Sequence, residues 1–465
     1  MLQIFKQYYP LRNIFFVAGE GIFIFVSVLL ASVIILGQES FVPDHRLLMK
    51  VFLITSVCQA CLYYNDLYDL KITNSFHELG IRLLQALGFA AIFLAFFYLL
   101  FPDAIIASGI FFVAVFITIL LIGSWRFGYS LILNRGLFNQ KIILLGSGGL
   151  IKDIKQEISE RKDCGYTMAL EVPENMGEVD LANPACTPIV CKNECEGLCA
   201  MAHTLGIKKV IVGLKERRTI SPIRELLRCR VDGIDVIDGN KFFENLTGKL
   251  TVESLDPSGL IFTGGFQKTL LRRFLKRAAD LILSVLMLIV CLPLIVIIAV
   301  LIKLDSKGPV FFSQERVGEK GKIYPVHKFR SMVDDAEKQC GPVWAQCDDD
   351  RITRVGKVIR RLRIDEIHQL YNVLKGEMSF VGPRPEREHF VKELEDLIPY
   401  YTIRYTVKPG ITGWAQVCYG YGASVEDAVE KLNYDLFYIK NMTTLMDFMI
   451  VLQTIKIVLF SKGAR

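Results

Sequence analysis

Two adjacent carboxylates, Asp365 and Glu366, stand in a stretch of the chain that is rich in arginine. Arg360 and Arg363 precede the pair, and Arg384 follows it between two prolines. Carboxylates are preferred ligands of Mg²⁺, and guanidinium groups bind phosphate through two parallel hydrogen bonds. The stretch therefore predicts a site that handles a metal ion and a phosphate together, as phosphoryl transfer requires.

The composition of the chain around these residues indicates a membrane protein. Of its 465 residues, 52% are hydrophobic, and the mean hydropathy is +0.37, which soluble enzymes rarely reach. The formal net charge of +6 is modest for this length and does not favour a nucleic-acid partner. Such a charge suits anionic lipid and phosphate surfaces instead.

The first 138 residues contain apolar runs that each approach the roughly 20 residues needed to cross a bilayer. We interpret this region as four retained transmembrane helices, because the first run is too long and too aromatic for a removable signal peptide. Lys6 and Arg12 before the first run and Arg126 after the fourth place both flanks in the cytoplasm under the positive-inside rule. The runs are Ile14 to Leu36, Leu47 to Tyr64, Ile81 to Phe101 and Ala104 to Ile122.

Beyond residue 138 the pattern changes to short strands that alternate with helical stretches. The run 141–145 predicts a buried strand, and a glycine turn at 146–149 leads from it into a helix. Further strand patterns follow at 209–214 and 233–237. This alternation predicts a small parallel, Rossmann-like α/β domain over residues 139–250.

The glycine turn leaves two interpretations of this domain open. It could hold the phosphate of a dinucleotide at a helix N-terminus, but the third glycine of the GxGxxG motif would fall on Ile151. We favour a structural or regulatory module without bound NAD. The sequence does not identify a ligand for it.

Twelve cysteines are scattered between segments that look cytoplasmic, so we expect reduced thiols. Cys191, Cys195 and Cys199 follow one another at a spacing of four, which would align three thiols along one face of a helix. A metal site would need a fourth ligand that is not evident. We favour packing of small apolar side chains, and the role of these cysteines stays open.

A linker at 251–270 leads to the basic residues Lys276 and Arg277, which are candidate partners of lipid head groups. An apolar run from Ala278 to Leu304 follows, with Pro293 near its middle. Because proline kinks a helix, the run is either a fifth span or a re-entrant helix that breaks near Leu292-Pro293 and returns. We favour the re-entrant helix, since a site that uses nucleotides belongs in the cytoplasm.

From residue 271 to residue 465 the chain closely resembles the bacterial sugar transferases, the catalytic domain of the monotopic polyprenyl-phosphate phosphoglycosyl transferases. The upstream part is similar to the large members of this family, in the branch associated with exopolysaccharide and exosortase gene clusters. Seven ordered motifs carry the resemblance: Lys276 to Asp280, Gly308 to Gly318, Lys328 to Met332, Asp350 to Thr353, Asp365-Glu366, Pro383 to Pro385 and Lys408 to Gln416.

The resemblance implies an enzyme that transfers sugar-1-phosphate from a nucleotide-diphosphate sugar, usually a UDP-sugar, to polyprenyl phosphate and releases UMP. Asp365 is then the nucleophile that forms a covalent phosphosugar intermediate. Glu366 assists it by binding Mg²⁺ or managing a proton, and both carboxylates are candidate metal ligands. Such an enzyme starts the assembly of an exopolysaccharide or another glycoconjugate.

The same resemblance implies which other residues bind phosphate or substrate: Arg360, Arg384, Pro383, Pro385, Lys328, Arg330 and Gln416. An unbroken helix would bring Arg361 close to Asp365 in place of Arg360, so we expect a break near Arg363. Where the family commonly has proline this chain has His368, which we interpret as a surface residue and not a general base.

The expected architecture is a membrane α/β protein whose catalytic domain, 271–465, lies at the membrane interface. We expect a multi-pass protein of the bacterial inner membrane with this domain on the cytoplasmic side, in contact with membrane lipids. Two other functions stay open: an NAD-dependent nucleotide-sugar epimerase or dehydratase, and a non-enzymatic membrane sensor that binds a nucleotide. The sequence does not identify the sugar or decide whether the chain forms a homodimer.

Overall fold

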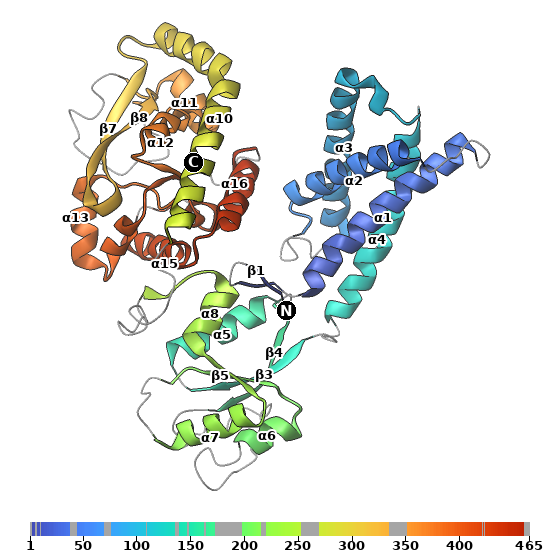
Figure 1. The fold of residues 1–465 in the computed structure, drawn as a ribbon, viewed down its shortest axis with the longest axis vertical. Coiled ribbons are helices and arrows are strands. Elements are labelled where there is room, and N and C mark those ends of the chain that lie inside the picture. Colours follow the sequence, from blue (N-terminus) through green and yellow to red (C-terminus); the bar gives the residue numbers. More distant parts are fainter. Residues whose placement is uncertain are drawn as a thin grey trace. The chain divides into compact units, whose positions relative to one another are not determined.

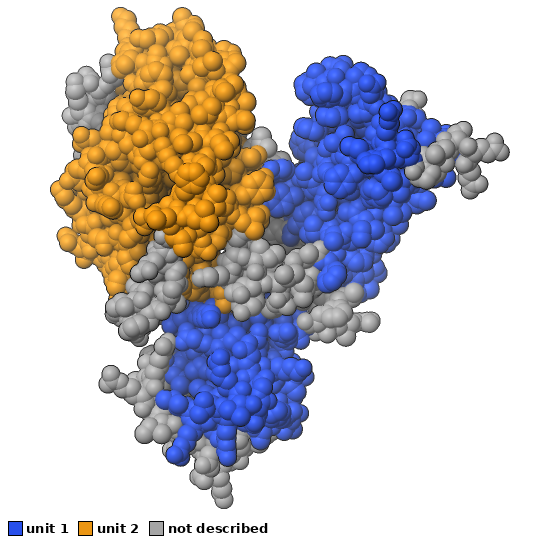
Figure 2. Space-filling model, viewed as in Figure 1, with its two compact units in different colours: residues 1–4, 8–242 blue, residues 5–7, 243–465 orange. Residues whose placement is uncertain are grey.

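The computed structural model describes residues 2–4, 7–9, 11–37, 44–68, 76–107, 109–134, 139–146, 148–161, 164–172, 198–214, 220–252, 269–333, 351–420, 422 and 424–459. The chain forms two compact units, shown in different colours in Figure 2. The first contains residues 1–4 and 8–242, and the second contains residues 5–7 and 243–465.

Long apolar helices form the N-terminal part of the first unit (Figure 1). Helix α1 packs against α4 and α2, and α2 packs against α3. Ile24, Leu62 and Ile122 are buried between them, whereas Phe52 and Phe112 face outward and are exposed. The elements are strands β1 (Leu2–Ile4) and β2 (Gln7–Tyr9), helices α1 (Leu11–Leu36), α2 (His45–Tyr64) and α3 (Phe76–Leu100), the 3₁₀ turn η1 (Pro102–Ala104), and α4 (Ile110–Asn134).

These helices confirm that several long apolar segments lie near the N-terminus. By length and composition, each of α1 to α4 contains a segment long and apolar enough to cross a membrane, and so does α10 (Leu270–Asp305) of the second unit. Outward-facing apolar side chains such as Phe52 suit contact with lipid. These five helices therefore indicate a membrane protein.

Arg126 lies inside α4 and not beyond it, which corrects the expectation that it flanks the fourth span. Its Nε lies 2.6 Å from a carboxylate oxygen of Glu20, and both side chains are buried. Its Nη1 also donates a 2.7 Å hydrogen bond to the carbonyl oxygen of Leu67. A charge buried among apolar helices needs such a partner, and sequence position alone does not reveal it.

A parallel α/β region completes the first unit and confirms that part of the predicted fold class. Its four strands pair in the order β4-β3-β5-β6, and every pairing is parallel. Ile142, Ile143 and Leu144 are fully buried, as expected for a central strand covered on both faces. The elements are β3 (Gln140–Leu145), α5 (Gly149–Glu160), β4 (Tyr166–Val172), α6 (Leu198–Thr204), β5 (Lys209–Val212), α7 (Ile220–Val231), β6 (Asp235–Asp238) and α8 (Gly239–Thr247).

The glycine turn after β3 packs against its own domain. Gly146 has a φ of +128°, and a Cβ atom there would lie 2.5 Å from the carbonyl oxygen of Gly213. A Cβ atom at Gly213 would in turn lie 2.6 Å from the side chain of Ile151. Close packing against backbone at Gly146 and against a side chain at Gly213 leaves no room for a Cβ atom at either position.

The longest helix of the second unit is α10, which contains Pro293. Figure 1 shows that the ribbon of α10 changes direction toward its C-terminal end. The helix continues through the proline as one element, so the structure does not have the break that was predicted near Leu292-Pro293. Proline removes one helical hydrogen bond, and the turns on either side of it keep theirs.

The rest of this unit is a compact α/β domain in which β7 pairs with β8 in an antiparallel hairpin and β9 pairs with β10 in parallel. Leu432, Leu436 and Phe437 lie at the centre of its largest core cluster. The elements after α10 are β7 (Phe311–Val317), η3 (Glu319–Gly321), β8 (Ile323–Phe329), α11 (Arg354–Arg361), η4 (Ile364–Glu366), α12 (Gln369–Lys375), β9 (Ser379–Val381), α13 (Glu388–Leu397), η5 (Tyr401–Thr406), β10 (Gly410–Thr412), α14 (Trp414–Cys418), α15 (Val425–Asn441) and α16 (Thr444–Leu459).

Lys276 connects the start of α10 to this domain. Its ammonium group donates to an Asp447 carboxylate oxygen at 2.8 Å, to the Val381 carbonyl oxygen at 3.0 Å and to the Tyr438 hydroxyl at 3.1 Å. Three partners use all three N–H donors of a lysine. The side chain proposed for lipid head groups is thus engaged inside the domain.

Arg277 and Asp280 add further connections between α10 and the domain. Arg277 donates to the carbonyl oxygens of Val373 and Leu374 in the last turn of α12, at 2.6 and 2.9 Å. The buried carboxylate of Asp280 accepts from the Ser379 hydroxyl at 2.8 Å and from the Phe380 N–H at 3.0 Å. The first turns of α10 are therefore joined to the rest of this domain by directed hydrogen bonds.

Candidate active site

Asp365 and Glu366 lie in the 3₁₀ turn η4, between helices α11 and α12. Thr353 caps α11 by accepting a hydrogen bond from the N–H of Gly356 at 2.9 Å, and the helix ends at Arg361. Arg363 then adopts the left-handed conformation, with a φ of +55°. This confirms the predicted break near Arg363. The carboxylates thus lie in a separate turn that precedes α12.

Glu366 is held as a carboxylate by two cations. Arg384 donates to both of its oxygens, at 2.7 and 3.4 Å, and the Lys328 ammonium lies at 3.4 Å. Burial opposes ionisation of this side chain, but Arg384 and Lys328 outweigh it and hold the pKa of Glu366 well below its usual value. Glu366 is therefore ionised at any physiological pH.

Asp365 has the opposite electrostatic environment. Burial, and then the neighbouring negative charge of Glu366, raise its pKa from 3.8 to about 6, against the opposing effect of Lys328, Arg384 and Arg360. Among the residues that the structure describes, none donates a hydrogen bond to this carboxylate. Glu366 is thus an ion-paired carboxylate with a lowered pKa, and Asp365 beside it has a raised pKa. Such a difference in environment gives the two carboxylates of a pair different chemical roles.

Arg384 is positioned by the backbone of its own loop. The loop follows β9, and the N–H of Gly410 donates to the carbonyl oxygen of Pro383 at 2.9 Å. Arg316 donates to the carbonyl oxygen of Pro385 at 3.2 Å. The two prolines therefore fix the loop that aims Arg384 at the dyad, rather than touching the dyad themselves.

The structure brings five predicted residues together: Asp365, Glu366, Lys328, Arg360 and Arg384. Two others have partners elsewhere in the domain. Arg330 is buried and donates to the carbonyl oxygens of Ser306 and Lys307 just after α10, at 2.8 and 2.9 Å. Gln416 donates to the carbonyl oxygen of Ile411 at 3.3 Å. Asp350, from one of the quoted motifs, lies outside the described residues.

Arg404 is a positioning residue that the sequence reasoning missed. Its guanidinium is buried, pairs with Asp435 at 3.0 Å and donates to the carbonyl oxygen of Arg384 at 3.0 Å. It thereby supports the backbone of the residue that holds Glu366. Its partner Asp435 is 31 positions away, so the sequence gives no local sign of the pair. The one available signal for Arg404 is that it is a charged residue in the tyrosine-rich stretch 400–407.

His368, predicted to be a surface residue, is half-buried and packs against aromatic side chains. Its ring stacks on Phe311, with centroids 4.1 Å apart, and also faces Tyr371 at 6.2 Å. Burial and the neighbouring His327 lower the pKa of His368, so its imidazole is neutral near pH 7. The side chain packs between the β7–β8 hairpin and α12, beside the dyad along the chain.

Comparison with known proteins adds an independent finding. Residues 271–461 match the family model described as bacterial sugar transferase. The chain is 44% identical over 242 residues to the UDP-N-acetylgalactosamine-undecaprenyl-phosphate N-acetylgalactosaminephosphotransferase of Aeromonas hydrophila. This alignment covers 52% of this chain and 56% of that protein. It is 43% identical over 194 residues to the undecaprenyl-phosphate glucose phosphotransferase of Komagataeibacter xylinus, covering 41% of this chain and 36% of that protein.

A shorter relative is matched over nearly its whole length. The exopolysaccharide production protein PSS of Rhizobium leguminosarum bv. phaseoli is 40% identical over 186 residues, which are 39% of this chain and 93% of that protein. By contrast, the alignments span about half or less of the two longer relatives. The similarity is therefore established most fully for the C-terminal unit that contains the dyad.

Proposed function

This chain belongs to the bacterial sugar transferase family, and on that premise we propose that it transfers sugar-1-phosphate from a UDP-sugar to polyprenyl phosphate and releases UMP. The observation that carries the proposal is the asymmetric dyad: Glu366 is ion-paired with Arg384 and Lys328, whereas no residue that the structure describes donates a hydrogen bond to Asp365, whose pKa is raised by burial and by Glu366. The names of the relatives support the acceptor class, because they describe phosphotransferases for undecaprenyl phosphate.

The proposed reaction proceeds in two displacements at one phosphorus atom. A carboxylate oxygen of Asp365 attacks the phosphorus that bears the sugar, the bond to the bridging oxygen breaks, and UMP leaves with the electron pair. An oxygen of polyprenyl phosphate then attacks the same phosphorus, and the bond to Asp365 breaks to restore the carboxylate. Covalent catalysis of this kind divides one displacement between two anions into two steps with oriented nucleophiles.

The cations around the dyad favour this chemistry. Arg384 and Lys328 offer positive charge to transferring phosphate oxygens, and Glu366 keeps both in place. Arg360 is close enough to act on Asp365 electrostatically. Glu366 thus positions Arg384 and Lys328, in addition to any proton transfer in which it takes part.

The dyad also fits a bound Mg²⁺. Asp365 and Glu366 are adjacent in η4, and no residue in the described part of the chain donates a hydrogen bond to the Asp365 carboxylate, so its oxygens are available to a cation. Mg²⁺ prefers one or two carboxylates together with phosphate oxygens and water, and oxygens of Asp365 and Glu366 would hold it here. When bound, the ion neutralises the charge of the donor diphosphate.

The proposed setting is the bacterial inner membrane, with four transmembrane helices, a Rossmann-like domain and a catalytic domain on the cytoplasmic side. The bend in α10 and the bonds of its first turns to the catalytic domain support a re-entrant helix that enters and leaves on one side. The product would start an exopolysaccharide or another glycoconjugate.

A labelling experiment tests the nucleophile. Purified protein is incubated with a UDP-sugar that carries a label in the phosphate attached to the sugar, without lipid acceptor, and covalently bound label is measured after denaturation. We expect stoichiometric labelling of the wild type and none of Asp365→Asn. Asp396→Asn, an exposed carboxylate on α13, serves as the matched control and should label normally. An unlabelled wild type, or label that persists in Asp365→Asn, contradicts the proposal.

A further inference from the structure

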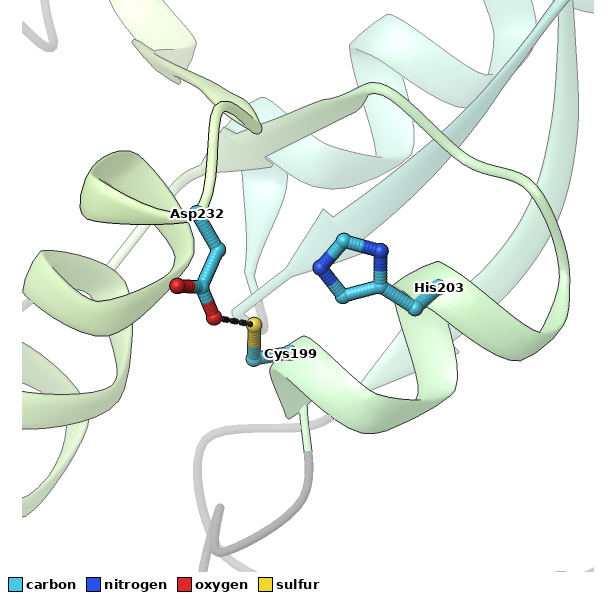
Figure 3. A group of neighbouring side chains, drawn as sticks. All are labelled: Cys199, His203 and Asp232. Atoms are coloured by element: carbon cyan, nitrogen blue, oxygen red, sulfur yellow. Dashed lines mark hydrogen bonds between the residues drawn. The ribbon is translucent and has the colours of Figure 1, made fainter.

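A second cluster of reactive side chains lies in the α/β region of the first unit, outside the proposed active site. It consists of Cys199 and His203, one turn apart on α6, and Asp232, which directly follows α7. Figure 3 shows the imidazole of His203 facing the pair formed by Cys199 and Asp232. One potential ligand atom from each residue lies within 4.8 Å of the others. The fold thus brings residues 29 to 33 positions apart into one group.

The three ligand types are those that Zn²⁺ prefers. Zinc binds thiolate sulfur at about 2.3 Å and imidazole nitrogen or carboxylate oxygen at about 2.0–2.2 Å, so neighbouring ligand atoms in a tetrahedral site lie roughly 3.3–3.7 Å apart. In the structure the Cys199 thiol donates to an Asp232 oxygen at 2.9 Å. A metal ion would replace the proton that this hydrogen bond shares.

The exposure of the three residues differs in a way that suits an ion entering from solvent. Cys199 is buried, whereas His203 and Asp232 are exposed and can turn by the small amount that metal binding requires. Cys199 belongs to the same hydrophobic core cluster as the fully buried Cys229, which holds its side chain on the inner side of the site. The cluster therefore has a fixed sulfur ligand on the inner side and adjustable ligands on the outer side.

We propose that Cys199, His203 and Asp232 bind one Zn²⁺ ion, with a fourth coordination position open to water. The ion would connect α6 to the end of α7 and so fix two helices of the α/β region, or release them when zinc is scarce. The proposal goes beyond the transferase function and does not depend on it. Cys191 and Cys195, which the sequence pattern grouped with Cys199, lie outside the described residues.

Cobalt substitution of the full-length protein tests the site. The chain is purified in detergent with a reductant, stripped with a chelator and titrated with Co²⁺ in the presence of excess Mg²⁺, which occupies oxygen-only sites such as the dyad. We expect charge-transfer absorption from thiolate to cobalt, saturating at one ion per chain and abolished by one equivalent of Zn²⁺. A wild type without this absorption overturns the proposal.

Variants assign the ligands. Cys199→Ser should remove the charge-transfer absorption, and His203→Gln and Asp232→Asn should each weaken Zn²⁺ binding by more than the roughly 10- to 100-fold that loss of an outer-shell partner costs. Cys164→Ser, a buried thiol of the same region outside the cluster, is the matched control and should bind as the wild type does. His203 and Asp232 are exposed, so their variants should fold even if Cys199→Ser does not. Unchanged affinity in both exposed variants overturns the assignment.

Discussion

The decrease in the rate of covalent labelling at low pH, the acid limb of its pH profile, provides the sharpest test of the dyad. Asp365 must be ionised to attack phosphorus, and burial together with the charge of Glu366 raises its pKa from 3.8 to about 6. The shift corresponds to about 3 kcal/mol against the charged form, since each pH unit represents about 1.4 kcal/mol. An Asp365 with this pKa is about 90% ionised at about pH 7 and about 9% ionised at about pH 5.

The rate of enzyme labelling under single-turnover conditions should therefore fall about tenfold between about pH 7 and about pH 5. An ordinary aspartate would change that rate by less than about 10% over the same interval. The assay omits the lipid acceptor, because a phosphate monoester titrates in this range and would confuse the result. The donor is a diphosphate diester and has no such group.

Two variants separate Asp365 from its neighbours in this assay. Glu366→Gln removes the adjacent negative charge and should move the acid limb to lower pH, whatever its effect on the maximal rate. His368→Gln removes the closest imidazole along the chain and should leave the limb in place. A flat rate between the two pH values, or a limb that disappears in His368→Gln, would refute the reasoning.

Three further predictions concern the residues and the ion that support the dyad. Arg404→Lys keeps a charge beside Asp435 but loses the donor to the Arg384 carbonyl, so labelling should slow by about tenfold or more while circular dichroism stays native. Asp280→Ala leaves the buried Phe380 N–H without its acceptor and should lower the free energy of unfolding of the catalytic domain by about 1–3 kcal/mol, measured by denaturant titration. Removal of divalent cations with a chelator should abolish labelling, and added Mg²⁺ should restore it; labelling that survives chelation would exclude the proposed ion.

Local sequence patterns were sufficient for part of the fold. Apolar length predicted the long helices, and buried runs alternating with helical stretches predicted β3, β5 and β6 but not β4, because both signals repeat within a few residues. The break at Arg363 was expected because the family resemblance assigns Arg360, and not Arg361, to the site. The roles of the site residues likewise came from the resemblance, whereas the adjacent carboxylates and arginines alone indicated only a site for a metal ion and a phosphate.

Interactions between distant residues could not be predicted in this way. Lys276 precedes an apolar run, and its neighbours in the chain therefore predicted a contact with lipid head groups. Its partners Val381 and Asp447 lie 105 and 171 positions further along the chain. Arg126 was assigned to a flank for the same reason, although its charge is matched by Glu20 on another helix. Long basic side chains reach whichever acceptor the fold brings near, and that choice is made by tertiary packing.

The hydrogen bonds from Lys276, Arg277 and Asp280 have a consequence for how the two proposed substrates meet. With α10 in the membrane, as proposed, the dyad would keep a fixed height above the bilayer, because these bonds join the first turns of α10 to the domain that contains the dyad. The nucleotide sugar arrives through water in three dimensions, whereas a lipid phosphate reaches this fixed height only by lateral diffusion. Turnover should then follow the number of acceptor molecules per unit area of bilayer, and dilution with inert lipid should slow it even when the amount of acceptor per volume is held constant.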